Sequence, residues 1–148
     1  MIVWRISNHA ALDGGGGLHA AGRWHSRGRP IVYCAESPAA ALLEILVHLE
    51  IDLEDLPVRY RLLKIELPDD IAAERLDPTA LPEGWAEDVA LTRRLGDAWL
   101  ASRRTARLDV PSATVPETWN ILLNPAHPDA ARARIVATAE HLLDPRLV

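Results

Sequence analysis

The stretch of sequence that decides the fold is PIVYCAESPAAALLEILVHLE, residues 30–50. Residues 30–35 form an apolar, β-branched run of strand length, which indicates a central, buried strand. Ser37 then suits a helix N-cap, and Pro38 suits the first helical turn, where its missing N–H costs nothing. The spacing predicts a helix from about Pro38 to Glu50, with a core stripe that consists of Leu42, Ile45, Leu46 and Leu49.

The chain before this stretch contains one strand and one long loop. Residues 2–6 have the pattern of a short strand. Residues 8–29 are rich in glycine and show no periodicity, so they are predicted to form a long structured loop. A loop of that length in a compact domain is usually functional or mobile.

The chain after it alternates between extended and helical patterns. Residues 59–67 alternate in polarity and predict a half-buried strand with Leu63, Ile65 and Leu67 on its inner side. Residues 68–82 are acidic, contain proline and predict a loop. A helix is expected from Gly84 to about Arg104, with one face formed by Trp85, Val89, Thr92, Gly96 and Trp99. Further short strands are expected at residues 108–115, 120–123 and 134–138.

This order of elements predicts an α+β fold rather than a βαβ winding. The chain has 148 residues, of which 49% are hydrophobic and 25% charged, values that suit one soluble globular domain over residues 1–148. We expect mixed or antiparallel sheets with flanking helices. The N-terminus does not resemble a signal peptide, and no apolar run is long enough for a membrane span, so a cytoplasmic protein is expected.

Several classes of function are disfavoured by composition. The formal net charge is −5 and no helix-turn-helix pattern is present, which argues against direct binding of nucleic acid. Cys34 is the only cysteine, so no intrachain disulfide can form. The six histidines are scattered without a ligand spacing, and we expect no metal site.

Two glycine-containing segments of the long loop are candidates for binding an anion. The run Gly14 to Gly17 lacks the spacing of a nucleotide-binding loop, and a flexible loop is the better interpretation. Residues 22–28, GRWHSRG, combine two arginines with Trp24 and His25. This segment is either a solvated basic turn or an anion clamp in which Arg23 binds a phosphate through two N–H groups.

Three further residues remain open from the pattern alone. Glu44 is either a helical glutamate at the edge of solvent, paired with His48, or a carboxylate that lines a cleft beside Tyr33. Ser112 has no nucleophile-elbow motif and is more suited to hydrogen bonding than to nucleophilic attack. Asn124 begins the sequence NPAHP, which is typical of a turn.

Taken in order, these pieces resemble the RES domain, a family named for its arginine, glutamate and serine. The resemblance covers nearly the whole chain and rests on WR at 4–5, GRWHSRG at 22–28, IVY at 31–33, AALLE at 40–44, LGDAWL at 95–100, VPSA at 110–113, Asn120, NP at 124–125, HP at 127–128 and DPRL at 144–147. It implies an ADP-ribosyltransferase-like fold and a bacterial toxin that consumes NAD⁺ as a substrate, with no separate cofactor. It also implies an Xre-type helix-turn-helix antitoxin as partner and a homodimer within a larger complex.

Residue by residue, the resemblance assigns the family's Arg to Arg23, its Tyr to Tyr33, its Glu to Glu44 and its Ser to Ser112. Arg23, Tyr33 and Glu44 are thereby expected to be catalytic, and Arg23 and Tyr33 also to bind NAD⁺ together with Ser112, His25, Arg27 and Asn124. His25 stands where many relatives carry Asn.

The expected chemistry is cleavage of the nicotinamide–ribose bond, which passes through an oxocarbenium-like sugar. Glu44 would stabilise that charge, Arg23 would hold the pyrophosphate and Tyr33 would face the nicotinamide. The ADP-ribose acceptor stays open between water, phosphate and a protein, so a mono-ADP-ribosyltransferase is an alternative. A catalytically inactive partner-binding module is another, although the joint presence of these three residues argues against it.

Overall fold

The computed structural model describes residues 1–48 and 58–147. Its strands and α-helices, in chain order, are β1 (Ile2–Ile6), α1 (Gly16–His19), β2 (Val32–Ala35), α2 (Pro38–His48), β3 (Arg59–Glu66), β4 (Ala73–Arg75), α3 (Val89–Ser102), β5 (Arg107–Pro111), β6 (Trp119–Leu123) and β7 (Arg134–Leu142). Short 3₁₀ segments lie at η2 (Pro78–Ala80), η3 (Trp85–Glu87), η4 (Pro128–Arg132) and η5 (Pro145–Leu147).

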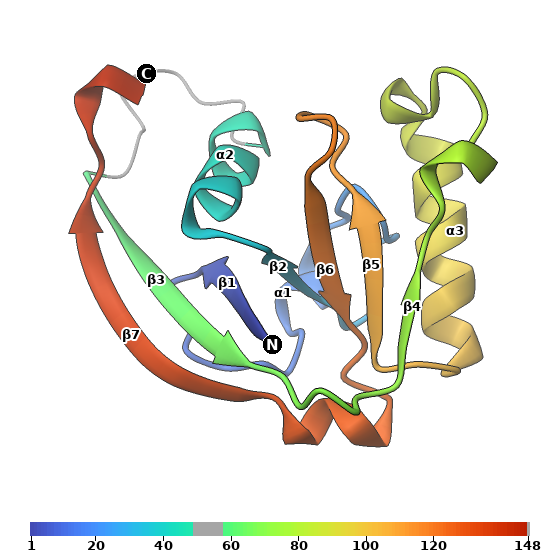
Figure 1. Ribbon diagram of the computed structural model, residues 1–148, viewed down its shortest axis with the longest axis horizontal. Coiled ribbons are helices and arrows are strands. Elements are labelled where there is room, and N and C mark those ends of the chain that lie inside the picture. Colours follow the sequence, from blue (N-terminus) through green and yellow to red (C-terminus); the bar gives the residue numbers. More distant parts are fainter. Residues whose placement is uncertain (49–57, 148) are drawn as a thin grey trace.

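The strands form one seven-stranded mixed sheet in the order β4-β5-β6-β2-β1-β3-β7. Every pairing is antiparallel except that of β4 with β5. The sheet bends strongly, so that β3 and β7 stand on one side and β5 and β4 on the other, with α2 between them (Figure 1). The predicted α+β class is confirmed.

The shortest pairing in the sheet is the one between β1 and β2, near its centre. β1 pairs with β3 over five residues, from Ile2 opposite Glu66 to Ile6 opposite Leu62. Its other neighbour, β2, pairs with it only where Trp4 lies opposite Ala35. The sheet therefore consists of two halves, β4-β5-β6-β2 and β1-β3-β7, that are joined at this one position and diverge from it.

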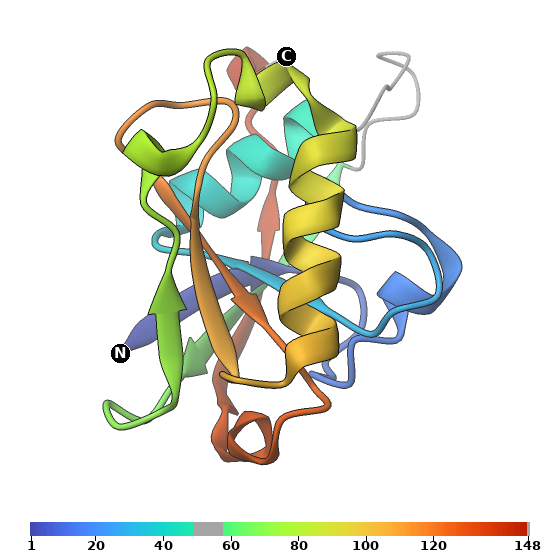
Figure 2. The same cartoon turned by 90° about the vertical axis from the view of Figure 1, so that its right-hand side faces the viewer.

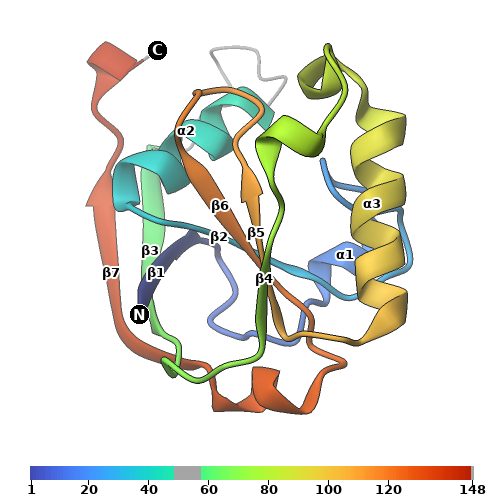
Figure 3. The same cartoon turned by 45° about the vertical axis from the view of Figure 1, so that its right-hand side comes forward.

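Two clusters of buried apolar side chains form the core around this sheet. The first joins both halves and consists of Val3, Val32, Cys34, Leu63, Ile65, Leu67, Ile121 and Leu123. The second packs α3 against β5 and β6 and consists of Trp24, Ile31, Trp99, Leu100, Leu108, Val110 and Leu122. α2 contacts β1 and β2, and its axis runs across that of α3 (Figures 2 and 3).

Strand β2 and the start of helix α2, which the sequence specified most clearly, form as predicted. β2 is central in the sheet, and Ser37 caps α2 by accepting a hydrogen bond at Oγ from the N–H of Ala40 at 3.1 Å. Of the predicted core stripe, Leu42, Ile45 and Leu46 are half-buried. Leu49 and the predicted helix end at Glu50 lie outside the described residues, as does the side chain of His48.

Three predictions about the second half of the chain were wrong in detail. Residues 68–82 are not all loop, because the short strand β4 pairs with β5. The helix predicted from Gly84 begins at Val89, since Gly84 has a φ of 78° and Asp88 provides the cap by accepting from the N–H of Leu91. β7 extends to Leu142, because β3 pairs with it from Arg134 to Leu142, with one register shift between Lys64 and Ile65.

Within residues 1–48 and 58–147, no helix is long and apolar enough to span a lipid bilayer.

Candidate functional site

A cavity of about 370 Å³ lies where the two halves of the sheet diverge. This volume is within the usual range for a small-molecule site. The cavity is lined by Trp4, Arg5 and Ile6 of β1, Tyr33, Cys34 and Ala35 of β2, Ala41, Glu44 and Ile45 of α2, Ala21, Gly22, Arg23 and Trp24 of the long loop, and Ala113 and Asn120. Arg23, Tyr33 and Glu44, which were singled out from the sequence, thus face one space from three different segments.

The loop that carries Arg23 is fixed in place by α3. Arg93 donates through Nε to the carbonyl of Gly22 at 2.8 Å, and Thr92 donates through Oγ1 to the carbonyl of Arg23 at 2.6 Å. One turn further along the helix, Gly96 lies so close to the loop that a Cβ there would be 1.6 Å from the carbonyl oxygen of Trp24. The absence of a side chain at Gly96 is therefore what lets the loop pack on the helix.

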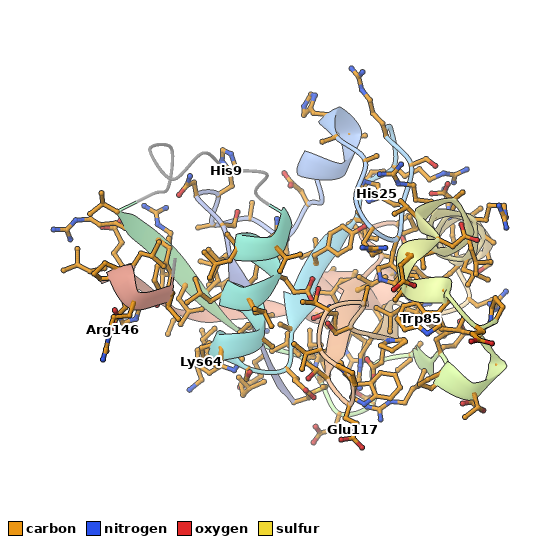
Figure 4. The ribbon with its side chains drawn as sticks, turned by 90° about the horizontal axis from the view of Figure 1, so that it is seen from above. His9, His25, Lys64, Trp85, Glu117 and Arg146 are labelled. Atoms are coloured by element: carbon orange, nitrogen blue, oxygen red, sulfur yellow. The ribbon has the colours of Figure 1, made fainter. Side chains whose placement is uncertain are left out.

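Asp97 holds the next part of the same loop. Its Oδ1 accepts from the N–H of Ser26 at 2.9 Å and its Oδ2 accepts from the Ser26 hydroxyl at 2.6 Å. Arg29 lies 3.5 Å from Oδ1 in an ion pair. Figure 4 shows His25 of this loop and Trp85 of η3 on the α3 side of the molecule.

The guanidinium of Arg23 is oriented by η3. Its Nη1 donates to the carbonyl of Ala86 at 2.7 Å. The side chain is half-buried and lines the cavity. An arginine held in this way presents a planar set of donors to an anion with little further loss of rotamer freedom.

Tyr33 lines the cavity, and His25, which is buried behind it, holds its hydroxyl in place. The Tyr33 hydroxyl lies 2.7 Å from His25 Nδ1 and accepts from the N–H of Trp24 at 3.1 Å. Burial raises the pKa of the Tyr33 phenol well above its ordinary value of 10, so the hydroxyl stays neutral. Tyr33 can therefore offer a ring face and a neutral hydroxyl, and it is not suited to act as a phenolate base.

Glu44 receives two hydrogen bonds at one oxygen. The Ser112 hydroxyl donates to Oε1 at 2.8 Å, and Asn120 Nδ2 donates to the same oxygen at 2.9 Å. Bonds from neutral donors to a carboxylate are charge-assisted and shorter than ordinary ones. Ser112 thus contacts Glu44, and it is not among the residues that line the cavity.

Cys34 and Arg5 also line the cavity, and neither was selected as a site residue from the sequence. Burial raises the pKa of the Cys34 thiol to about 12, so it is not a thiolate nucleophile. Arg5 Nη1 donates to the carbonyl of Tyr33 at 3.0 Å across the seam between β1 and β2. Its Nε is buried and has no hydrogen-bond partner in the described part of the chain.

The other residues expected to bind NAD⁺ lie outside the lining of the cavity. His25 is buried behind Tyr33, and Arg27 is exposed to solvent. Asn124 is buried in a turn, where Nδ2 donates to the carbonyl of Leu100 and Oδ1 accepts from the N–H of Ala126. Among the described residues, no three His, Cys, Asp or Glu side chains gather where they could hold a metal ion.

Comparison with known proteins identifies matches over most of the chain. The RES domain family model matches residues 2–144. "Toxin Res" of Pseudomonas putida (strain KT2440) is 53% identical over 135 residues, which cover 91% of this chain and 92% of the relative. "Prs ADP-ribosylating toxin" of Sphingobium sp. (strain YBL2) is 41% identical over 98% of this chain and 95% of its own, and "Toxin Res" of Photorhabdus laumondii is 36% identical over 100% and 97%.

Proposed function

Because the chain belongs to the RES domain family, we propose that it is a toxin that acts on NAD⁺ by breaking the bond between nicotinamide and ribose. One observation carries the proposal: Arg23, Tyr33 and Glu44 line a single cavity of about 370 Å³. This set combines a cation, an aromatic ring and a carboxylate. These are the groups needed for a pyrophosphate, a nicotinamide ring and a sugar that becomes positively charged.

The role of Glu44 follows from the charge that develops in the reaction. When the bond from ribose C1′ to the pyridinium nitrogen breaks, its electron pair leaves with nicotinamide and the ribose becomes oxocarbenium-like. No general acid is needed, since the leaving group already carries the positive charge. A carboxylate fixed beside the ribose stabilises charge that is present only in the transition state, and so it raises kcat.

The remaining residues bind and orient. Arg23 would hold the pyrophosphate by bidentate hydrogen bonds, which suits a guanidinium already held by Ala86. The Tyr33 ring would pack against the cationic nicotinamide. In the hydrolytic reaction, a water oxygen then bonds to C1′ and releases one proton; inorganic phosphate in place of water would give the phosphorolytic reaction.

The test is release of nicotinamide by the purified chain from NAD⁺, with and without inorganic phosphate. The wild type is expected to release nicotinamide, and Glu44→Gln to lose at least about a hundredfold in rate. The matched control is Glu83→Gln, the same substitution at an exposed glutamate away from the cavity, which should act like the wild type. Folded wild-type protein that releases no nicotinamide would leave an inactive binding module as the better description.

A second candidate function is transfer of ADP-ribose to a protein. The observation that favours it is the relative named "Prs ADP-ribosylating toxin", which is 41% identical over 98% of this chain. Incubation of the chain with NAD⁺ and a bacterial lysate separates the two reactions. Transfer would leave an ADP-ribose mass on a protein, whereas NAD⁺ breakdown would leave free ADP-ribose or its 1-phosphate.

The proposed toxin needs a partner that keeps it inactive in the producing cell. We propose an Xre-type helix-turn-helix antitoxin that covers the NAD⁺ cavity near the Arg23 loop, with the toxin as a homodimer in the complex. Co-expression with the antitoxin should block nicotinamide release. A complex that still turns over NAD⁺ at the rate of the free chain would contradict this mode of inhibition.

A further inference from the structure

Asn120 occupies a position where the fold calls for an apolar residue. It lies in the interior strand β6, opposite Ala35 of β2 and Val110 of β5. The next three residues of β6 are each at most 2% exposed, and Asn120 itself is 8% exposed. Asparagine is disfavoured in strands, and its buried amide costs free energy unless it is hydrogen-bonded.

The amide of Asn120 is only half satisfied. Nδ2 donates to Glu44 Oε1 at 2.9 Å, whereas Oδ1 is buried and has no hydrogen-bond partner in the described part of the chain. The reversed amide would place its oxygen against the carboxylate oxygen, so Glu44 fixes the orientation. A buried acceptor left without a partner is uncommon in native proteins, and the fold accepts this cost at a residue that contacts Glu44.

The hydrogen bond from Ser112 does not by itself fix the orientation of the Glu44 carboxylate. Its Oγ accepts from the N–H groups of Thr114 at 3.1 Å and Val115 at 3.2 Å, which leaves its own hydrogen to point at Glu44 Oε1. A single bond of this kind still lets the carboxylate turn about it. The second donor, from Asn120 on a different strand, restricts this rotation further.

We propose that Asn120 is a positioning residue that acts through Glu44, an inference that rests on the proposed function. Asn120 and Ser112 fix one carboxylate oxygen of Glu44 and so set the plane of the carboxylate toward the ribose. Electrostatic stabilisation of a transition state depends on such preorganisation, because a carboxylate that must first turn contributes less to the rate.

The test uses two substitutions that nearly preserve side-chain volume. Asn120→Leu removes the donor, and nicotinamide release should fall by roughly ten- to hundredfold in kcat with little change in KM for NAD⁺. Asn120→Asp places a second carboxylate beside Glu44. Its activity should be low at neutral pH and recover as the pH falls, because the new carboxyl group can donate again once it is protonated. The other charged or titratable side chains that line the cavity are Arg5, Arg23, Tyr33 and Cys34. Burial raises the pKa of the Tyr33 phenol and of the Cys34 thiol, so neither of these two groups loses its proton in this pH range.

A double-mutant cycle separates positioning from general damage. If Asn120 acts through Glu44, then Asn120→Leu should have no further effect on the residual rate of Glu44→Gln. An equal loss in both backgrounds, or a wild-type kcat for Asn120→Leu, would overturn the inference. Wild-type protein that releases no nicotinamide would instead reject the proposed function.

Crystal structures provide a readout that does not depend on activity. In Asn120→Leu, and in Asn120→Asp at neutral pH, the Glu44 carboxylate should turn away from its wild-type plane. A carboxylate that keeps the same plane and the same bond to Ser112 in both variants would show that Asn120 does not position it.

Discussion

The imidazole of His25 and the phenol of Tyr33 form one hydrogen-bonded unit, with 2.7 Å between His25 Nδ1 and the Tyr33 hydroxyl. Nδ1 also accepts from the N–H of Gly22 at 3.1 Å, and Nε2 lies 3.0 Å from the carbonyl of Ala20. This pattern fits the neutral ring with its proton on Nε2, because a protonated ring has no acceptor. The unit therefore depends on His25 staying neutral.

We expect this dependence to appear in the stability of the protein as a function of pH. Burial lowers the pKa of His25 below its ordinary value of 6.5. The unfolded chain therefore binds a proton at a higher pH than the folded chain does. His25 imposes no penalty on folding above about pH 7.5, and the penalty grows as the pH falls through 6.5 to the lowered folded pKa.

The measurement is a series of thermal melts between pH 8 and pH 5 for the wild type and His25→Asn. Asparagine offers an acceptor that does not titrate, so the wild type should lose more stability toward low pH than the variant does. The other histidines are common to both proteins and cancel in the difference. Parallel curves for the two proteins would show that the buried imidazole does not titrate with folding.

The sequence predicted best those parts of the fold that local residues determine. β2 and the start of α2 follow from a β-branched run and from Ser37 with Pro38, all within a few residues. β4 was missed because its three residues carry little strand signal of their own. It forms because Leu76 N–H and the residues before it find a partner in β5, more than 30 positions later in the chain.

The same contrast applies to the candidate site. Arg23, Tyr33 and Glu44 were selected from local motifs and from the family resemblance, and the structure places them in one cavity. Asn120 and Arg5 belong to the motifs on which the resemblance rests, but they were not given site roles, because their importance depends on which strands flank them. A further signal was their type, since a polar or charged residue inside a short apolar strand conflicts with the strand pattern.

Arg23→Lys tests whether the loop binds an anion through the fork of the guanidinium. Lysine keeps the charge but cannot reproduce the bidentate contact, so KM for NAD⁺ should rise by roughly tenfold or more with a smaller change in kcat. Arg27→Lys is the matched control, because Arg27 belongs to the same loop but is exposed and does not line the cavity. An equal rise in KM for both variants would point to a diffuse basic surface instead of a clamp.

Gly96→Ala tests whether α3 positions the Arg23 loop. Alanine favours a helix over glycine by about 1 kcal/mol, but its Cβ would lie 1.6 Å from the carbonyl oxygen of Trp24. Because that oxygen belongs to the backbone, the loop must shift. We expect a net destabilisation of about 1–3 kcal/mol and a higher KM for NAD⁺.

The control for this substitution is Gly16→Ala. A Cβ at Gly16 meets nothing within 4 Å, and Gly16 lies in α1 on the same long loop. Its melting temperature should be equal to or slightly above that of the wild type, and its KM should be unchanged. A Gly96→Ala variant with wild-type stability and KM would show that the loop can move away from α3 without consequence.

Asp109→Ala tests which ion pair stabilises the sheet. The Asp109 side chain is 3% exposed and is bound by Arg107 at 2.7 Å through two nitrogens, while Arg75 approaches it from β4 at 3.3 Å. Removal of the carboxylate leaves a largely buried guanidinium without its partner. That type of change costs about 3–5 kcal/mol, which is a large part of the stability of a domain of this size.

The comparison is Glu74→Ala, which breaks the pair between Glu74 and Arg104 in the same region of the sheet. Arg104 is 62% exposed, so water and salt already screen this pair, and the melting temperature should hardly change. Neither acidic residue lines the cavity, so nicotinamide release below the melting temperature should be retained in both variants. Equal losses of stability would mean that burial does not distinguish the two pairs. A loss confined to Asp109→Ala would show that the buried carboxylate of β5, with its partners Arg107 and Arg75, contributes more to stability than the exposed pair does.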